Sequence, residues 1–325
     1  MAPQTTPFYS DNLACRHAGF RIGIDIGGTK IEAVLIGPDN VVVSDARIPA
    51  RRGNEQVVED VVAIARSVAG EHIESVLSVG IGIPGQVDST VGRVNHVVNL
   101  DINSLELGPL ASEQLGLPVH VENDVNAAAV GAAHLLSGSD MTGAIVLLNF
   151  GTGMAAGIVV DGELRHGYSG AIGEIGHIPV DPNRFPCPCG QHGCLETVCS
   201  GASVGRLWPK SDPPMPGLIV AARNGESDAE NVLAMVTHAI VDAVQIAAQA
   251  YDPRLIIFGG GMAKTGQPLL EVTLDELSRR ESDCPFLAGL HLADRLRLAP
   301  VDEPLGALGA AWAASDVVGN RNRNV

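Results

Sequence analysis

The sequence is poor in aromatic residues and in basic residues. Aromatic side chains make up 3% of its 325 residues, which leaves few rings for stacking on nucleic-acid bases. Lys and Arg total 21 against 37 Asp and Glu, a net charge of -16. A surface of this sign repels both a DNA duplex and an anionic membrane. We therefore expect neither nucleic acid nor a membrane as a partner.

Segments that would direct the chain out of the cytoplasm are also missing. The opening residues, MAPQTTP, lack the basic stretch and apolar run of a secretion signal. We find no apolar stretch that is long and glycine-free enough to cross a membrane, because Asn149 and several glycines interrupt the run over 144–160. Three of the six cysteines are clustered, and Cys15, Cys199 and Cys284 are expected to be unpaired, which suits a reducing compartment. These features predict a cytoplasmic protein.

Core material and glycine are abundant. Hydrophobic residues make up 46% of the chain, enough to fill two packed domains, and the 18% of charged residues argues against disorder. The 38 glycines predict many tight turns and close approaches of backbone to a ligand.

The apolar periodicity predicts an α/β protein in which one unit occurs twice. The order strand, glycine turn, strand, turn, strand is found over 21–48 and again over 144–166. Helical spacing and apolar runs predict helices over 55–69, 110–115, 124–136, 229–250, 269–280 and 305–314, and further strands over 75–83, 119–121, 254–258 and 296–299. The repeat predicts two similar domains that face each other across a cleft.

We divide the chain on this pattern. The predicted parts are a flexible N-terminus (1–18), a small α/β domain (19–123), a large α/β domain (124–304), a helix that packs back on the small domain (305–318) and a flexible tail (319–325).

A cluster of metal-ligand residues lies in the second half of the chain. Residues 187–196 read CPCGQHGCLE, and a histidine precedes them by ten positions. The four ligands of a closed tetrahedral zinc site would be His177, Cys187, Cys189 and Cys194, with His192 as a rival for the histidine position. Two carboxylates, Glu174 and Glu196, flank the cluster. A metal that only held the fold together would not need them, so we place the cluster beside a reacting site.

Three glycine turns each follow an apolar strand. Their residues are Asp25, Gly27, Gly28, Thr29 and Lys30 in the first turn, Gly151, Thr152 and Gly153 in the second, and Gly259, Gly260 and Gly261 in the third. Glycine permits positive φ and lets backbone N–H groups point at an anion, while Asp25 could hold a water of Mg²⁺. One such turn alone is more often an ordinary hairpin. Three in one chain favour phosphate binding, although none matches the Walker or the dinucleotide fingerprint.

A polar segment, VENDVN over 121–126, stands where a buried strand meets a helix. Asp124 has two interpretations. It could be the N-cap of the helix, since Asp is a favoured cap. It could also be a general base, because a carboxylate beside an amide can take a proton from an alcohol. Phosphoryl transfer to an alcohol needs a phosphate cradle, a metal and such a carboxylate.

Taken together, these motifs resemble those of the ROK family (repressors, open reading frames, sugar kinases), in particular its bacterial ATP-dependent glucokinases. The matching segments are DIGGTK at 25–30, GIPG at 82–85 through Asn99-Leu100, ENDVNAAA at 122–129, FGTG at 150–153 through GEIGH at 173–177, and the zinc motif at 187–196. They span roughly residues 20–315. The resemblance implies the actin-like ATPase fold, with two α/β domains around a central cleft.

The resemblance also implies roles for individual residues. Asp124 would be the base for the sugar hydroxyl, and Zn²⁺ would be held by His177, Cys187, Cys189 and Cys194. The sugar would be bound by Gly85, Asn99, Asn123, Asp124, Glu174, His177 and Glu196, and the three glycine turns would bind ATP with Mg²⁺. The reaction would convert ATP and a hexose, glucose first, into ADP and the hexose 6-phosphate. A homodimer or homotetramer is expected.

The sequence departs from the family pattern at two places. Asp101-Ile102-Asn103 lacks the tryptophan that often follows the Asn-Leu pair, and Ala155-Ala156 stand where many relatives have glycines. Other acceptors are therefore open: fructose, N-acetylmannosamine, N-acetylglucosamine or an aminosugar of secondary metabolism, as is polyphosphate as the donor. A sugar-sensing regulator would need a DNA-binding helix-turn-helix, for which about twenty residues before the first strand are too few.

Overall fold

The computed structural model describes residues 19–321, so the predicted flexible segment 1–18 and Cys15 lie outside the described residues. The chain divides into two compact units. Unit 1 comprises the described residues up to Gly131 and those from Pro304 onward, and unit 2 comprises 132–303. The division falls inside helix α3 (Asp124–Ser137). The helix expected to end at 314 continues to Arg321, so residues 319–321 of the predicted tail are helical.

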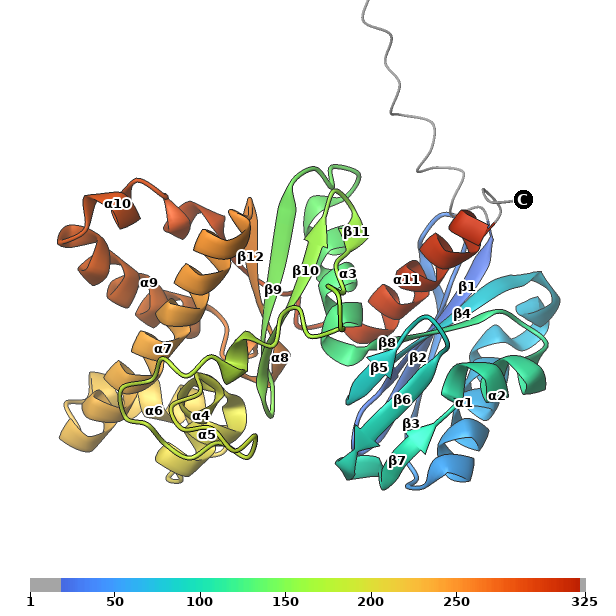
Figure 1. The fold of residues 1–325 in the computed structure, drawn as a ribbon, viewed down its shortest axis with the longest axis horizontal. Coiled ribbons are helices and arrows are strands. Elements are labelled where there is room, and N and C mark those ends of the chain that lie inside the picture. The colour runs from blue at the N-terminus through green and yellow to red at the C-terminus, as the bar shows by residue number, and fades with distance from the viewer. Residues whose placement is uncertain (1–18, 322–325) are drawn as a thin grey trace, which may run out of the picture. The chain divides into compact units, whose positions relative to one another are not determined.

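Unit 1 is built on a five-stranded sheet in the order β3-β2-β1-β4-β8 (Figure 1). Its strands are β1 (Phe20–Ile26), β2 (Lys30–Ile36), β3 (Val42–Pro49), β4 (Val76–Ile83) and β8 (Val119–Asn123). The first three form the predicted antiparallel meander, and β4 and β8 continue in parallel. Because β4 is an interior strand that is covered on both faces, its sequence is a nearly continuous apolar run.

Helices cover both faces of this sheet. On one face, Ile22 and Ile24 pack in a core with α1 (Asn54–Ala69) and α2 (Leu107–Leu115). On the other face lies α11 (Leu305–Arg321), which contacts β1 and β4. The approach there is close, since a Cβ added to Gly23 would lie 1.8 Å from the carbonyl oxygen of Ala307. Glycine in the strands therefore allows the last helix to pack on the first sheet.

A second, smaller sheet in unit 1 was not predicted. It joins β5 (Gln86–Asp88), β6 (Arg93–Val97) and β7 (Ile102–Leu105) in that order. Two short 3₁₀ turns, Gly70–Ser75 and Val98–Leu100, complete the unit, and the second contains Asn99.

Unit 2 repeats the strand order of unit 1. Its sheet runs β11-β10-β9-β12-β13, with β9 (Ala144–Phe150), β10 (Met154–Val160), β11 (Glu163–Leu164), β12 (Leu255–Gly259) and β13 (Leu296–Leu298). Again the first three strands in sequence are antiparallel, and the last two are parallel to β9 and to each other. Two three-strand meanders, each extended by two parallel strands, account for the repeat seen in the sequence.

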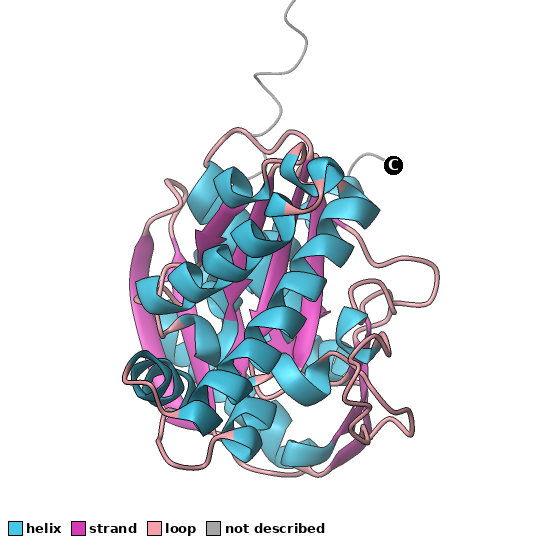
Figure 2. Ribbon diagram, turned by 90° about the vertical axis from the view of Figure 1, so that its left-hand side faces the viewer, coloured by secondary structure: helices cyan, strands magenta, loops and turns pink. Residues whose placement is uncertain are grey.

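Helices lie across the strands of unit 2, as Figure 2 shows. They are α4 (Glu196–Cys199), α5 (Gly201–Leu207), α6 (Pro214–Arg223), α7 (Ser227–Tyr251), α8 (Gly260–Ala263), α9 (Gln267–Ser282) and α10 (Pro285–Ala288), with 3₁₀ turns at Ile175–His177 and Leu292–Arg295. The expectation that no segment is long and apolar enough to span a membrane is wrong for α7, which passes that test. In the structure α7 packs against α6, α9 and β9, and Val236, Ile240 and Val244 lie in the core. The helix is apolar because it is central to the unit.

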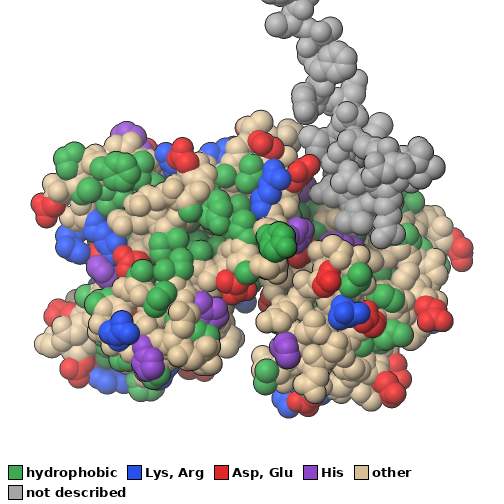
Figure 3. Space-filling model, viewed as in Figure 1, with side chains coloured by type: hydrophobic (Ala, Val, Ile, Leu, Met, Phe, Trp, Pro, Cys, Tyr) green, Lys and Arg blue, Asp and Glu red, His purple; other side chains and the backbone are tan. Residues whose placement is uncertain are grey.

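Many of the basic side chains stand beside acidic ones. Arg47 pairs with Glu32, and Arg223 pairs with Glu271 at 2.8 Å. On the face drawn in Figure 3, the Lys and Arg side chains are spread among the acidic ones.

Candidate functional site

The first glycine turn joins β1 to β2 in unit 1. The N–H of Gly27 donates to the carbonyl of Lys30 at 2.8 Å and closes the turn. Gly28 lies against Asn99, because a Cβ added to it would be 3.1 Å from the Asn99 Cβ. Thus a predicted phosphate residue and a predicted sugar ligand lie together. The ammonium group of Lys30, however, lies 3.1 Å from a carboxylate oxygen of Glu32, which partly neutralises it.

Asp25 is the last residue but one of β1, and its carboxylate lies close to glycine backbone. A Cβ added to Gly306 would lie 2.6 Å from Cγ of Asp25, and one added to Gly82 would lie 3.7 Å from its Oδ1 and 3.8 Å from Cα of Asp124. Burial, and then the charge of Asp124, raise the pKa of Asp25 to about 7. Two neighbouring carboxylates of this kind fit a hard cation such as Mg²⁺, which would relieve their repulsion.

The carboxylate of Asp124 stands at the first residue of α3, but the cap of that helix is its neighbour. The Oδ1 atom of Asn123 accepts hydrogen bonds from the N–H groups of Val125 at 2.9 Å and Asn126 at 3.3 Å. These are the bonds to the second and third helical residues that define an N-cap. The Oδ1 atom of Asp124 accepts from the N–H of the adjacent Val125 at 3.0 Å, which is not the bonding pattern of an N-cap. Asn123, and not Asp124, is therefore the N-cap of α3.

Glu122 is a residue of this site that sequence reasoning did not assign. It is 2% exposed, and its Oε1 accepts from the N–H of Asn123 at 2.9 Å and from Nδ2 of Asn126 at 3.0 Å. Nδ2 of Asn123 donates to the carbonyl of Gly85 at 3.3 Å, which links two predicted sugar ligands. Glu122 therefore holds the backbone N–H of Asn123 and the side-chain amide of Asn126, which lie on either side of Asp124 in the sequence.

Unit 2 contains a cavity of about 400 Å³ beside the second and third glycine turns. Its walls are formed by Gly151, Thr152, Gly201, Ala202, Val204, Pro213, Pro214, Met215, Pro216, Gly261, Met262, Lys264 and Thr265. Gly151, Thr152 and Gly261 were predicted to bind nucleotide; the apolar wall from α5 and α6 was not predicted. Gly260 has a φ of 79°, and a Cβ there would lie 2.5 Å from the Phe150 carbonyl carbon. The size and the apolar wall fit a nucleotide base and ribose.

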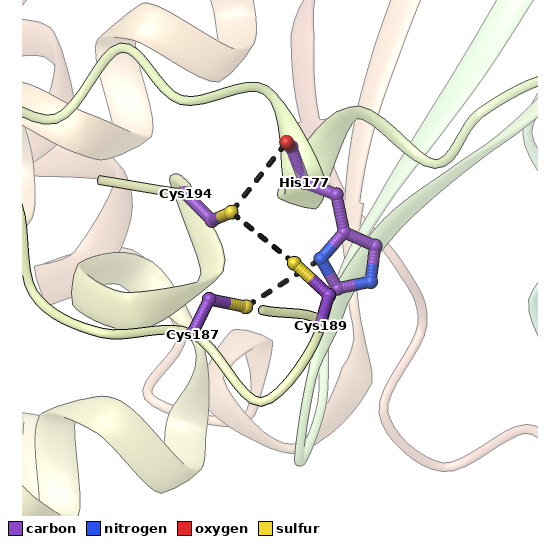
Figure 4. A group of neighbouring side chains, drawn as sticks. All are labelled: His177, Cys187, Cys189 and Cys194. Atoms are coloured by element: carbon purple, nitrogen blue, oxygen red, sulfur yellow. Dashed lines mark hydrogen bonds between the residues drawn. The ribbon is translucent and has the colours of Figure 1, made fainter. Parts of the chain in front are cut away.

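The predicted metal ligands of unit 2 converge, as Figure 4 shows. The ligand atoms of His177, Cys187, Cys189 and Cys194 all lie within 4.8 Å of one another. Nδ1 of His177 is 3.7 Å from Sγ of Cys187, and the Sγ atoms of Cys189 and Cys194 are also 3.7 Å apart. Around a tetrahedral zinc ion, neighbouring ligand atoms are about 3.3 to 3.8 Å apart. The donor set and the spacing both fit Zn²⁺, and His192 lies outside this cluster.

The thiols of the cluster differ in their readiness to ionise. Hydrogen bonds from the Gln191 backbone and side chain lower the pKa of Cys189 to about 6. Burial raises the pKa of Cys194 to about 12. Three close thiols cannot all ionise without a cation between them, so the cluster is suited to a divalent metal.

The two flanking carboxylates lie in different surroundings. Glu174 is exposed, just before the 3₁₀ turn that carries His177. Glu196 begins α4, with its Oε1 4.0 Å from Sγ of Cys187 and its Oε2 accepting from the N–H of Met154 at 3.1 Å. The departures Ala155 and Ala156 lie in β10, paired with Asn149 and Leu148, and not in the glycine turn itself.

Comparison with known proteins gives one family. The sequence model of the ROK family matches residues 21–317. A glucokinase of Streptomyces coelicolor is 31% identical over 274 residues, which cover 78% of this chain and 85% of that protein. The crystal structure of a ROK hexokinase from Thermus thermophilus aligns with a TM-score of 0.79 and 28% identity, over 93% of this chain and 99% of the other. The crystal structure of a ROK family glucokinase from Streptomyces griseus, in complex with glucose and AMPPNP, aligns with a TM-score of 0.71 and 29% identity. The alignment covers 92% of this chain and 100% of the other.

The fold is thus the actin-like ATPase fold that the motifs implied. Regulators are also among the matches. A xylose repressor of Caldicellulosiruptor bescii is 24% identical over 292 residues, which cover 83% of this chain and 73% of the repressor.

Proposed function

Since the chain belongs to the ROK family, we propose that it is an ATP-dependent sugar kinase that transfers the γ-phosphate to the 6-hydroxyl of a hexose. Glucose is the first candidate, because the similar proteins include glucokinases. The observation that carries the proposal is the arrangement around Asp124. Asn123 caps α3 in its place, and Asp25 lies close enough for the two carboxylates to interact.

In this proposal Asp124 accepts the proton of the sugar hydroxyl as phosphorus is attacked. A carboxylate at the start of a helix is held in a fixed direction, and the buried Glu122 fixes the neighbouring amides. Asn99, Asn123 and the backbone at Gly85 would then bind the remaining hydroxyls. Such positioning is most of what an enzyme contributes to phosphoryl transfer.

The nucleotide would occupy the cavity of unit 2. Its base would lie against the apolar wall that includes Val204, Met215 and Met262, and the phosphates would approach the turn at Gly151-Thr152-Gly153. Mg²⁺, when bound, would neutralise charge on the phosphates, with Asp25 as its holder on the protein side. The turn at 27–30 would contribute backbone N–H groups to phosphate binding.

The zinc cluster would support the sugar-binding residues. Nδ1 of His177 faces the thiols, so its Nε2 remains to meet a sugar hydroxyl. Because the cluster offers four protein ligands, the metal would have no open position for substrate and would act by holding His177, Glu174 and Glu196 in place.

A screen of hexoses tests this function. Purified protein is incubated with Mg²⁺, ATP and each candidate sugar, and ADP release is followed in a coupled spectrophotometric assay, with polyphosphate as a second donor. We expect ATP-dependent phosphorylation of at least one hexose, and the order of kcat/KM identifies the preferred one. Fructose, N-acetylmannosamine, N-acetylglucosamine and aminosugars are the alternative acceptors. Absence of turnover with every sugar and both donors would refute the proposal.

Because a repressor is among the similar proteins, a second candidate function is that of a sugar-sensing regulator without catalysis. It predicts sugar binding without phosphorylation, together with a shift of operator-like DNA in a gel at moderate salt. The net charge of -16 opposes DNA binding, so we favour the kinase. As a kinase it would act in the cytoplasm, as a homodimer or homotetramer, which light scattering after gel filtration can decide.

A further inference from the structure

Two hydrogen bonds hold the glycine turn between β9 and β10, and both come from the segment that directly follows the metal cluster. Oε2 of Glu196 accepts from the N–H of Met154 at 3.1 Å, at the end of the turn. The N–H of Gly201 donates to the carbonyl of Gly151 at 2.8 Å, at its start. A Cβ added to Gly153 would lie 2.6 Å from Oε2 of Glu196, so the carboxylate packs directly on the turn.

The same segment is tied to the thiol cluster. The carbonyl of Cys194, two residues before Glu196, accepts from both the N–H of Thr197 at 2.9 Å and its hydroxyl at 2.7 Å. Oε1 of Glu196 lies 4.0 Å from Sγ of Cys187. Glu196 is thus the one residue with an oxygen on the cluster and an oxygen on the turn among the contacts resolved for the described residues.

The position of Gly201 is fixed from the same side. The hydroxyl of Ser203 donates to the carbonyl of Glu196 at 2.7 Å, and Ser200 caps α5 by accepting from the N–H of Ser203 at 3.2 Å. The short helix α4 and the start of α5 are therefore hydrogen-bonded to each other and to the segment that carries Cys194. A displacement of the cluster would therefore shift Glu196 and Gly201, the two residues that are hydrogen-bonded to Met154 and Gly151.

We propose that Glu196 is a positioning residue for the nucleotide, through which an occupied metal cluster holds the 151–154 turn in the form that accepts phosphate. This rests on the proposed function, because it assumes that the turn binds ATP. It differs from a sugar-only role for the cluster, since it makes nucleotide affinity depend on Glu196 and on the metal even when no sugar is present.

The test measures nucleotide binding without sugar. The affinity of AMPPNP with Mg²⁺ is determined by calorimetry for the zinc-loaded wild type, Glu196→Ala and Glu196→Gln. Glu196→Ala should raise Kd about tenfold, the effect of losing a hydrogen bond to a charged acceptor. Glu196→Gln should stay within about twofold, since an amide oxygen still accepts from Met154. The control Glu163→Ala, which removes an exposed carboxylate on β11, should bind as the wild type does.

A second measurement does not depend on how a variant folds. Hydrogen exchange of the amides over 150–154 is compared in the wild type before and after chelation of the metal, with re-addition of Zn²⁺. The turn should exchange faster without metal and recover with it. Unchanged exchange, or equal affinity in wild type and Glu196→Ala, would overturn the inference while leaving the kinase assignment intact. A wild type that binds no AMPPNP would overturn the proposed function, and this inference with it.

Discussion

Asn123 and Val125 are joined by the bond that begins helix α3: the side-chain oxygen of Asn123 accepts from the N–H of Val125 at 2.9 Å. This bond makes Asn123 the N-cap of α3. The adjacent Asp124 then needs no capping role to explain its position. Because the cap fixes the first turn of α3, it also fixes the direction in which the Asp124 carboxylate leaves the backbone.

Removal of the cap should weaken the fold. We expect Asn123→Ala to lower the free energy of unfolding by about 1 kcal/mol, and Asn123→Ser to restore most of it, because serine is also a good N-cap. Urea denaturation of the two variants and the wild type measures the difference. If Asp124→Ala costs more than Asn123→Ala, the cap has been assigned to the wrong residue.

The stability of the ligand-free protein should fall as the pH rises through the range of Asp25. Its pKa is about 7 in the folded chain against an ordinary value of 3.8. Between these values the unfolded chain releases a proton that the folded chain retains, so rising pH favours unfolding, and the penalty is complete above pH 7.

The variant Asp25→Asn removes this titration. Relative to the variant, the wild type should lose stability between about pH 4 and pH 7, on the order of a few kcal/mol. Thermal unfolding of both proteins across this pH range, without Mg²⁺ or nucleotide, provides the comparison. Parallel curves would show that the carboxyl is not held neutral by its surroundings.

The thiol cluster should contain zinc. Metal analysis is expected to give about one zinc per chain, and Cys189→Ser, which exchanges one ligand, should lose metal and activity together. Cys199→Ser is the matched control, because that buried thiol donates to the carbonyl of Leu195 and belongs to no cluster resolved in the described residues. Full activity in metal-free protein would show that the metal is not needed to hold the sugar-binding residues in place.

The cavity of unit 2 should be the nucleotide site. Ala202 is exposed and lines it, so Ala202→Trp adds bulk to the cavity without disturbing the core. We expect a rise in the KM for ATP of at least about tenfold, with an unchanged melting temperature. Ala288→Trp, on the exposed side of α10, is the control. Equal KM values in the two variants would place the nucleotide elsewhere.

The main strands of the two five-stranded sheets, such as β1, β4 and β9, could be predicted because they are long and apolar. The repeat over 21–48 and 144–166 reappears as the same strand order in both units. The sheet β5-β6-β7 could not be predicted, since its strands have 3 to 5 residues and are largely polar. The long helix α7 shows the opposite difficulty, because a core helix and a membrane span have the same composition.

Within the site, residues of a distinctive type could be predicted from the sequence. The residues that surround them and hold them in place could not. The thiols and the glycine turns stand out by residue type. The apolar wall over 213–216 has no such signal, since proline and methionine are ordinary at the start of a helix such as α6. The raised pKa of Asp25 depends on burial among residues such as Gly306, which the fold brings from the far end of the chain. Conversely, Asp and Asn are both good caps, so sequence alone could not choose between Asp124 and Asn123.

Turnover by Asp124→Asn tests the central claim most directly. The substitution keeps the size and shape of the side chain but removes its ability to accept a proton at neutral pH. With the preferred hexose and saturating ATP, kcat should fall by at least about 100-fold while calorimetry gives a sugar Kd close to that of the wild type. A variant that binds the sugar and turns over at a rate near that of the wild type would contradict the assignment of Asp124 as the base.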